Sequence, residues 1–340
     1  MQAYQIKAGQ QIAGLELVQR TISAPDAREV HVRVHAISLN YRDLMIADGK
    51  YLSTGDVPVV PCSDGAGEVI AVGAQVTRFR VGDRVAASFF PDWVYGAPTT
   101  QNTAGALGAA VDGMLAEEVV LHEDALVTIP SHLSYVEAAT IPCAGVTAWN
   151  SLFVEGRLRA GDSVLLLGTG GVSIWALQLA KAAGLRAIIT SSSDEKLERA
   201  RGLGAAATIN YKTTPEWQDE VLRLTEGRGV DLVLEVGGQG TLTRSIASTR
   251  MGGTVAIIGG VSGFGFGGEL SPFALIGGAK RLSGIFVGSR SMFEDLNRFL
   301  SVAEIHPIVD RVFLFEQARD AYTHLEKAAH FGKVVIEVVK

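Results

Sequence analysis

Six residues at positions 168–173, Gly-Thr-Gly-Gly-Val-Ser, have the composition of a turn that binds phosphate. The apolar run at 164–167 before them is long enough for a buried strand and too short for a helix. Apolar residues at helical spacing follow, and Gly184 is a natural stop. A strand, a glycine turn and a helix let backbone N–H groups face a pyrophosphate.

We therefore expect a dinucleotide site here, although a plain tight turn is the alternative. Ser173 replaces the third glycine of the G-x-G-x-x-G pattern. The residues expected to contact the cofactor are Gly168, Thr169, Gly170, Gly171 and Val172.

The next strand, at 187–190, indicates which dinucleotide binds. A site that prefers NAD carries an acid about 20 residues past the first glycine. This strand instead runs into Ser191-Ser192-Ser193, with Lys196 and Arg199 nearby. Hydroxyl groups and cations can bind the 2′-phosphate of NADPH. We predict NADPH, held by Ser191, Ser192 and Lys196. Asp194 argues for NADH, but we interpret it as a helix N-cap.

The elements that position these residues alternate between strand and helix from about residue 131. Such alternation predicts an α/β fold, a doubly wound parallel sheet of two mononucleotide-binding halves. Helices are expected at Ser173–Ala183 and Asp194–Leu203. The expected strands are Val164–Leu167, Ala187–Thr190, Ala207–Ile209, Asp231–Val236, Thr254–Ile258 and Leu282–Val287.

The flanking segments have a different pattern. Residues 1–130 contain short alternating strands at 29–37, 67–72, 84–87 and 118–120, typical of a barrel-like domain, and a long loop at 96–116. After 288, helices at 293–302 and 316–328 precede a strand at 333–339, expected to rejoin the first domain. The predicted domains are 1–130, 131–288 and 289–340.

Composition limits the class of protein. The 340 residues are 47% hydrophobic and 19% charged, with a net charge of −6, which argues against a nucleic-acid surface. Cys62 and Cys143 lack CxxC spacing, which fits a reducing compartment. We find no signal peptide and no apolar run long enough to span a membrane, so a cytoplasmic enzyme is expected.

Several motifs occur in order along the chain: Asn40-Tyr41-Arg42-Asp43, Pro61–Gly67, Val81–Val85, Pro142–Trp149 and Gly332–Val335. They resemble motifs of the medium-chain dehydrogenase/reductase superfamily. The resemblance implies a GroES-like barrel domain beside a Rossmann domain. It is strongest to the zinc-independent quinone oxidoreductase-like branch, which includes NADPH-dependent enoyl reductases.

The comparison with the superfamily's zinc alcohol dehydrogenases predicts that no metal is bound. Asn40 stands in place of their first cysteine ligand, and Cys62-Ser63-Asp64 in place of a Gly-His-Glu motif. Only Cys143 keeps a ligand-like position, whereas catalytic zinc needs three protein ligands. Residues 90–116 carry none of the structural cysteines. His31 and His35 share a strand face with Arg33, which favours a solvated face over a metal site.

Without zinc, a carbonyl loses its main electrophile. A quinone or an α,β-unsaturated carbonyl delocalises the charge of an incoming hydride itself, so hydrogen-bond donors suffice. We therefore predict hydride transfer from NADPH to a conjugated carbonyl of a small-molecule substrate. The alternatives are a zinc-type alcohol dehydrogenase and an NADPH-binding redox sensor without turnover.

The resemblance also implies roles for individual residues. Asn40 would face the nicotinamide, and Tyr51 would donate a proton, unless water does so. Trp93 and Tyr95 would line the substrate pocket or cover the core. Asp43, Asp64 and Asp83 are interpreted as turn and hydrogen-bond residues. Arg290 would lie near phosphate or form a salt bridge at the domain interface, and a homodimer is expected. The further cofactor contacts are Thr147, Tyr211, Gly237, Gly259, Gly260, Val287, Ser289, Arg290 and Lys333.

Overall fold

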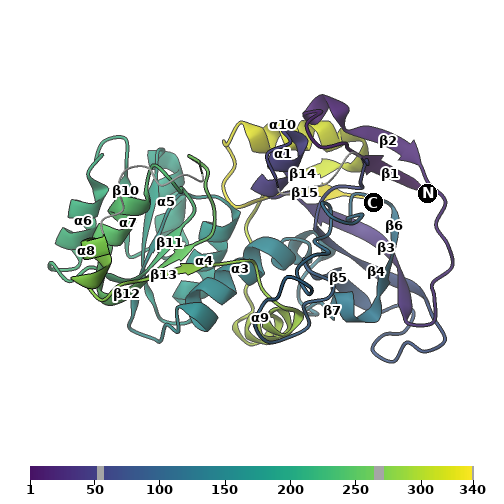
Figure 1. Cartoon of the computed structure of the whole chain (residues 1–340), viewed down its shortest axis with the longest axis horizontal. Coiled ribbons are helices and arrows are strands. Elements are labelled where there is room, and N and C mark those ends of the chain that lie inside the picture. Colours follow the sequence, from purple (N-terminus) through teal and green to yellow (C-terminus); the bar gives the residue numbers. More distant parts are fainter. Residues whose placement is uncertain (52–56, 264–271, 339–340) are drawn as a thin grey trace. The chain divides into compact units, whose positions relative to one another are not determined.

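The computed structural model describes residues 1–51, 57–263 and 272–338, and it divides into two compact units (Figure 1). The first unit comprises Met1–Val146 and Gly288–Lys340, and the second comprises Thr147–Val287. The sequence pattern placed the first boundary at 130/131, before the segment 131–146. Val339, the end of the strand predicted at the C-terminus, lies outside the described residues.

The segment 131–146 belongs to the first unit because its side chains pack there. Helix α2 (Tyr135–Ala138) begins at Ser134, whose hydroxyl accepts a hydrogen bond from the Glu137 N–H at 3.2 Å. The Tyr135 ring stacks on His35, with centroids 4.2 Å apart, and lies 4.7 Å from the Arg84 guanidinium. The sequence pattern therefore changes near residue 131, before the boundary between the two units after Val146.

The first unit is built on a seven-stranded sheet in the order β14-β15-β3-β4-β5-β7, with β6 also paired to β3. The last strand, β15, pairs antiparallel with β3, so the end of the chain completes the sheet that its beginning starts. Val30, Val32 and Val34 of β3 point into the core. The strands are β3 (Glu29–Ser38), β4 (Asp64–Val72), β5 (Arg84–Ala87), β6 (Glu118–His122), β7 (Leu126–Thr128), β14 (Val309–Leu314) and β15 (Lys333–Glu337).

Shorter elements complete this unit. Strands β1 (Gln2–Gln5) and β2 (Glu16–Gln19) form a separate antiparallel pair. No helix and no strand interrupts residues 96–116, all of which are described, as the weak sequence pattern predicted. The helices are α1 (Tyr41–Ala47), α9 (Arg290–Ala303) and α10 (Ala318–Glu326), with short turns η1 (Ile12–Gly14), η2 (Glu123–Ala125), η3 (Ile141–Gly145) and η5 (Phe315–Gln317).

The second unit confirms the α/β prediction. Its six strands are all parallel and run in the order β10-β9-β8-β11-β12-β13, the order 3-2-1-4-5-6 of a doubly wound dinucleotide-binding sheet. Strand β13 ends at Gly284, earlier than expected. The strands are β8 (Ser163–Leu166), β9 (Arg186–Ser191), β10 (Ala207–Asn210), β11 (Val230–Glu235), β12 (Thr249–Ile257) and β13 (Arg281–Gly284).

Helices cover this sheet because parallel strands connect through crossovers (Figure 1). Every residue of β8 and of β11 is buried, which explains their continuous apolar runs. Within the described residues, no helix has the length and apolar character needed to cross a bilayer. The helices are α4 (Gly171–Ala182), α5 (Asp194–Gly202), α6 (Trp217–Leu224), α7 (Leu242–Ser248) and α8 (Pro272–Ile276); α3 (Val146–Trp149) and the π-helical η4 (Asn150–Glu155) lead into the unit.

Candidate active-site residues

The turn between β8 and α4 presents bare backbone. Gly168 has a φ of 73°, a conformation that favours glycine. A Cβ atom added to Gly168 or to Gly170 would meet no atom within 4 Å. Gly170 precedes α4, and its position carries no side chain that caps the helix N-terminus. The Gly168 N–H donates to the Thr190 hydroxyl at 3.2 Å. The positive end of α4, in open space, fits the pyrophosphate of a dinucleotide.

Ser173, which replaces the third glycine, has a structural role that the sequence did not reveal. Its side chain is buried, and its hydroxyl donates a hydrogen bond to the Leu167 carbonyl at 2.7 Å. This bond holds the first turn of α4 against the end of β8. A small polar residue thus joins helix and strand where a glycine would let them approach closely.

The residues expected to recognise the adenosine end meet at the carboxyl ends of β9 and β10. Ser191 pairs in register with Asn210, and the Tyr211 N–H donates to the Ser191 carbonyl at 3.1 Å. The Ser191 hydroxyl accepts from the Ser193 N–H at 3.3 Å. Ser192 follows directly, and Tyr211 is 42% exposed, so one edge of the sheet presents hydroxyl groups.

One prediction at this edge was wrong. Ser193, not Asp194, is the N-cap of α5, because its hydroxyl accepts from the Lys196 N–H at 3.3 Å. Asp194 is the first helical residue, and its carboxylate accepts from the Asn210 side chain at 2.8 Å. The Asp194 carboxylate therefore lies beside Asn210, which is the last residue of β10 and directly precedes Tyr211.

The glycines that follow β11 and β12 lie at the same end of the sheet. Gly238 has a φ of 82°, and a Cβ atom on it would lie 2.6 Å from the Gly260 Cα. A Cβ atom on Gly259 would lie 3.2 Å from the Val236 carbonyl oxygen. These glycines are therefore required for one turn to pack on the other, whatever they bind.

Glu235, the last residue of β11, organises that turn, and sequence reasoning missed it. The carboxylate is fully buried and accepts from the N–H groups of Gly237 and Gly238, at 2.7 and 2.9 Å. The hydroxyls of Thr241, at 2.6 Å, and Ser245 donate to it as well. The available signal was an acid after the apolar run Leu232–Leu234, directly before Val236 and two glycines.

Thr147 and Val287 lie at the two ends of the second unit. Thr147 is buried, and its carbonyl accepts from the Ser151 hydroxyl at 2.7 Å. Val287 has a φ of 54°, and its carbonyl accepts from the Asn150 side chain at 2.8 Å. Asn150 thus connects the segment that enters this unit to the segment that leaves it.

In the first unit, Asn40, Asp64 and Lys333 form a buried polar cluster. Their exposed fractions are 9%, 0% and 3%. The Lys333 ammonium donates to Asn40 Oδ1 and to the Leu39 carbonyl, both at 2.6 Å, and lies 4.0 Å from Asp64 Oδ2. Lys333, expected as a cofactor contact, therefore contacts the predicted catalytic asparagine. Asn40 Nδ2 is buried and has no hydrogen-bond partner among the described residues.

Neighbouring groups fix the cluster in place. Asn40 begins α1: its N–H donates to Asp43 Oδ2 at 2.7 Å, and the Asp43 N–H donates to the Asn40 carbonyl at 2.9 Å. Asp64 accepts from the Ser63 hydroxyl at 2.7 Å and from the Cys143 N–H at 3.2 Å. Asp43 and Asp64 are thus hydrogen-bond residues, as predicted.

Burial controls the protonation of this region. It raises the pKa of Asp43 to about 6, against the opposing effect of the Arg42 guanidinium, and it raises the pKa of Asp64 against that of Lys333. Burial and the Asp64 carboxylate raise the pKa of the Cys143 thiol to about 12.

These residues do not fit a catalytic zinc. Among residues 1–51, 57–263 and 272–338, no three His, Cys, Asp or Glu side chains come together as a metal site. His31 instead contacts Glu118 at 2.8 Å, and His35 stacks on Tyr135. The Lys333 ammonium contacts Asn40, the residue that stands in place of the first cysteine ligand of the zinc enzymes.

Tyr51 lies against a buried cation. The Arg42 guanidinium is 4.9 Å from the centre of the Tyr51 ring and 4.4 Å from that of Phe89, and its Nη1 donates to the Leu107 carbonyl at 2.7 Å. Burial raises the pKa of the Tyr51 phenol, while Arg42 opposes that rise. Arg42, only 7% exposed, is a second residue that sequence reasoning missed. Its signal was a cation inside the motif that contains Asn40.

Trp93 and Tyr95 differ sharply. Trp93 is buried, and its Nε1 donates to the Gly96 carbonyl at 3.0 Å, so it covers the core and fixes the following loop. Tyr95 is 76% exposed. Asp83 accepts from the Arg80 N–H at 2.9 Å within a turn, as expected.

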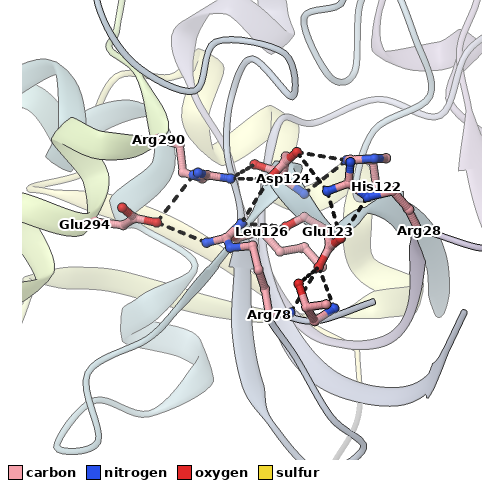
Figure 2. A network of polar contacts seen from close by, with 9 residues as sticks. Arg28, Arg78, His122, Glu123, Asp124, Leu126, Arg290 and Glu294 are labelled. Carbon is pink, nitrogen blue, oxygen red and sulfur yellow. Dashed lines mark hydrogen bonds and ion pairs between the residues drawn. The ribbon is translucent and has the colours of Figure 1, made fainter. Parts of the chain in front are cut away.

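Ser289 and Arg290, expected near the cofactor, have partners within the first unit. The Ser289 hydroxyl caps α9 by accepting from the Met292 N–H at 3.3 Å. Arg290 lies 2.6 Å from Asp124 Oδ1 and 3.4 Å from Glu294, as Figure 2 shows. Arg290 thus forms salt bridges, and both of these partners belong to its own unit.

Both parts of the chain match family models. Residues 26–131 match the alcohol dehydrogenase GroES-like domain, and residues 171–302 match the zinc-binding dehydrogenase family. A zinc-type alcohol dehydrogenase-like protein of Schizosaccharomyces pombe is 47% identical over 314 residues, 91% of each chain. A quinone oxidoreductase of Pseudomonas aeruginosa is 32% identical over 320 residues, 92% of each chain.

Solved structures agree with these matches. An NAD-dependent alcohol dehydrogenase superposes with a TM-score of 0.90 at 35% identity, over all of both chains. A mycobacterial protein in complex with NADPH superposes with a TM-score of 0.83 at 25% identity, over 99% of this chain and all of the other. Fold, motifs and relatives lead to one assignment: the chain belongs to the medium-chain dehydrogenase/reductase superfamily and is an oxidoreductase.

Proposed function

We propose that this enzyme is an NADPH-dependent, zinc-independent reductase of conjugated carbonyl compounds, that is, of quinones or α,β-unsaturated carbonyls. The observation that carries the proposal is the buried Asn40 amide. Its Nδ2 donor is unpartnered within the described residues, and Lys333 holds its oxygen. An amide donor supported by an ammonium replaces the metal of the zinc enzymes.

The chemistry follows from where charge develops. A bound dihydronicotinamide supplies a hydride. When the β-carbon of a conjugated acceptor gains that hydride, a new C–H bond forms and the π electrons move onto the carbonyl oxygen. A fixed hydrogen-bond donor such as Asn40 Nδ2 stabilises this oxygen. The enolate then takes a proton at its α-carbon from Tyr51 or from water.

The zinc-type reaction fits these residues less well. Interconversion of an alcohol and an aldehyde places its charge on one oxygen, which zinc stabilises by several kcal/mol. Cys143 is the one ligand-like thiol, and Lys333 contacts Asn40, which stands in place of the first cysteine ligand. Because the matching family model is described as a zinc-binding dehydrogenase and some relatives are alcohol dehydrogenases, the zinc-type reaction is the alternative that the experiment must distinguish from our proposal.

The preference for NADPH rests on the hydroxyl edge of β9 and β10. The hydroxyls of Ser191, Ser192 and Tyr211, at the ends of these two strands, are of the kind that can bind a 2′-phosphate, which supports the proposal. The Asp194 carboxylate opposes this preference, although Asn210 already donates to it. Relatives of both kinds exist, one named NAD-dependent and one solved with NADPH.

A single panel tests these proposals. The purified protein is given NADPH or NADH with quinones, enones, enoyl thioesters and simple aldehydes, and the same sample is analysed for metal. We expect oxidation of NADPH by conjugated acceptors without stoichiometric zinc. Alcohol oxidation that stops on chelation would establish the zinc-type reaction. A lower KM for NADH would overturn the cofactor assignment, and cofactor binding without any turnover would indicate a sensor.

We also propose a homodimer, joined through the six-stranded sheet, of which β10 and β13 are the edge strands. An edge strand leaves backbone groups that a second copy can pair with. Light scattering after size-exclusion chromatography should give twice the chain mass. A monomeric mass at micromolar concentration would contradict the proposal.

A further inference from the structure

We propose that Lys333 is a positioning residue for the reaction: it orients the Asn40 side chain so that Nδ2 is presented to the carbonyl oxygen of the acceptor. The inference rests on the proposed function. It replaces the role of cofactor contact that the motif around Lys333 implied.

The lysine determines which way the amide faces. A protonated lysine has three donors and no acceptor, so the Asn40 atom 2.6 Å from Nζ must be the carbonyl oxygen. The amide nitrogen then points to the other side. The orientation of an asparagine amide is often ambiguous, but here the chemistry of the partner settles it.

The backbone holds the lysine in turn. Lys333 Nζ also donates to the Leu39 carbonyl at 2.6 Å, directly before Asn40 in the chain. Lys333 begins β15, and the Leu39 N–H donates to the Val334 carbonyl at 3.0 Å. The side-chain contact is thus fixed by the junction between the end of β3 and the start of β15.

The unpartnered donor indicates that the arrangement serves a ligand. Buried polar groups in proteins are nearly always hydrogen-bonded, so an exception calls for an explanation. Asn40 Nδ2 is buried and has no hydrogen-bond partner of standard geometry among the described residues, although the Asn40 side chain lies close enough to the Asp64 carboxylate to lower its pKa. An oxygen atom of a bound ligand would accept the hydrogen bond that Asn40 Nδ2 can donate.

The charge of Lys333 strengthens that donor. An ammonium on the amide oxygen draws electron density from the nitrogen, and hydrogen bonds in a chain polarise one another. Asp64 compensates the buried charge from 4.0 Å, beyond hydrogen-bond distance, so it does not compete for the lysine's donors. Neither Lys333 nor Asn40 changes its covalent state in the reaction.

The test is a double-mutant cycle on the complete enzyme. Asn40→Ala, Lys333→Met and the double variant are assayed with the best conjugated acceptor from the panel, and the Kd for NADPH is measured by fluorescence. One lost oxyanion donor typically lowers kcat about 100-fold. We expect that loss for Asn40→Ala, a loss of at least ~10-fold for Lys333→Met, and a double variant no slower than Asn40→Ala. The Kd for NADPH should stay within about twofold in all three.

Two controls keep the test decisive. Lys327→Met makes the same substitution at an exposed lysine of the first unit and should leave kcat unchanged. Should Lys333→Met fail to fold, Asp64→Asn/Lys333→Met removes both buried charges and is assayed instead. Lys333→Arg keeps the charge and should recover part of the rate.

Four results would overturn the inference. Losses of kcat that multiply in the double variant would show that the residues act independently. A weakened Kd for NADPH with unchanged kcat would make Lys333 a cofactor contact. A wild-type enzyme that reduces no conjugated acceptor would refute the proposed function and this inference with it, whereas an active wild type with an equally active Lys333→Met would refute the inference alone.

Discussion

The two units offer two different kinds of site. In the second unit, the turn after β8 is backbone and open space, since a Cβ atom on Gly168 or Gly170 would meet nothing within 4 Å. In the first unit, the cluster of Asn40, Asp64 and Lys333 consists of side chains that are at most 9% exposed. The turn after β8 depends on the absence of side chains, which leaves open space beside the backbone. A buried side-chain site depends on groups that compensate one another, so changes within it should reduce stability most.

The largest effect should follow from removing one charge of the cluster. Lys333→Met leaves the Asp64 carboxylate buried without the cation that holds its pKa down. Breaking a buried ion pair in this way typically costs about 3–5 kcal/mol of unfolding free energy. Urea unfolding measures it. The double variant Asp64→Asn/Lys333→Met should be more stable than Lys333→Met alone. If Lys333→Met unfolds at the wild-type urea concentration, the pair contributes nothing to folding.

A pH-dependent effect of similar size should come from Asp43. Burial raises its pKa from 3.8 to about 6, so folding favours the protonated acid. Its stabilising contribution is therefore complete below about pH 4 and is lost as the pH rises through 6. Asp43→Asn imitates the neutral acid. Relative to wild type, this variant should gain about 3 kcal/mol of stability between pH 4 and pH 7. Parallel stability curves for the two proteins would contradict the raised pKa.

The backbone site should respond in binding more than in stability. Gly168→Ala places a side chain at a φ of 73° and should cost about 1–2 kcal/mol of stability. It should also weaken NADPH binding by ~10-fold or more, since the added methyl group would occupy the open space in which we expect the pyrophosphate to bind. Gly161→Ala is the matched control: its φ is 93°, it also has open space, and it lies before β8. It should lose similar stability and keep its Kd. Equal Kd values for NADPH in both variants would show that its pyrophosphate does not bind at this turn.

The same difference explains what the sequence could predict. A turn that needs bare backbone requires glycine, and its place after a buried strand is local, so residues 168–172 and the doubly wound sheet were predictable. The contact of Lys333 with Asn40 joins residues 293 positions apart and exists because β15 pairs with β3. No local pattern carries such a contact.

Other differences have the same cause. Segment 131–146 has the pattern of the unit that follows it, but Tyr135 packs on His35 of the unit that precedes it. The cap of α5 was misplaced by one residue because serine and aspartate cap equally well. Arg42 could be recognised as a cation within a motif, but not as one that lies between Tyr51 and Phe89.

The smallest effect should come from Ser173, at the end of the turn 168–173, because its side chain is buried and hydrogen-bonded like those of the cluster in the first unit. Ser173 is buried and donates to the Leu167 carbonyl at 2.7 Å. Ser173→Ala should cost about 1 kcal/mol of unfolding free energy, the usual contribution of one buried hydrogen bond. The Kd for NADPH should stay at its wild-type value, because the hydroxyl is already committed to the strand. Ser173→Gly restores the glycine of the common pattern and should bind NADPH equally well. A weaker Kd in Ser173→Ala, at unchanged stability, would instead make this hydroxyl a phosphate ligand and would extend the open backbone site into α4.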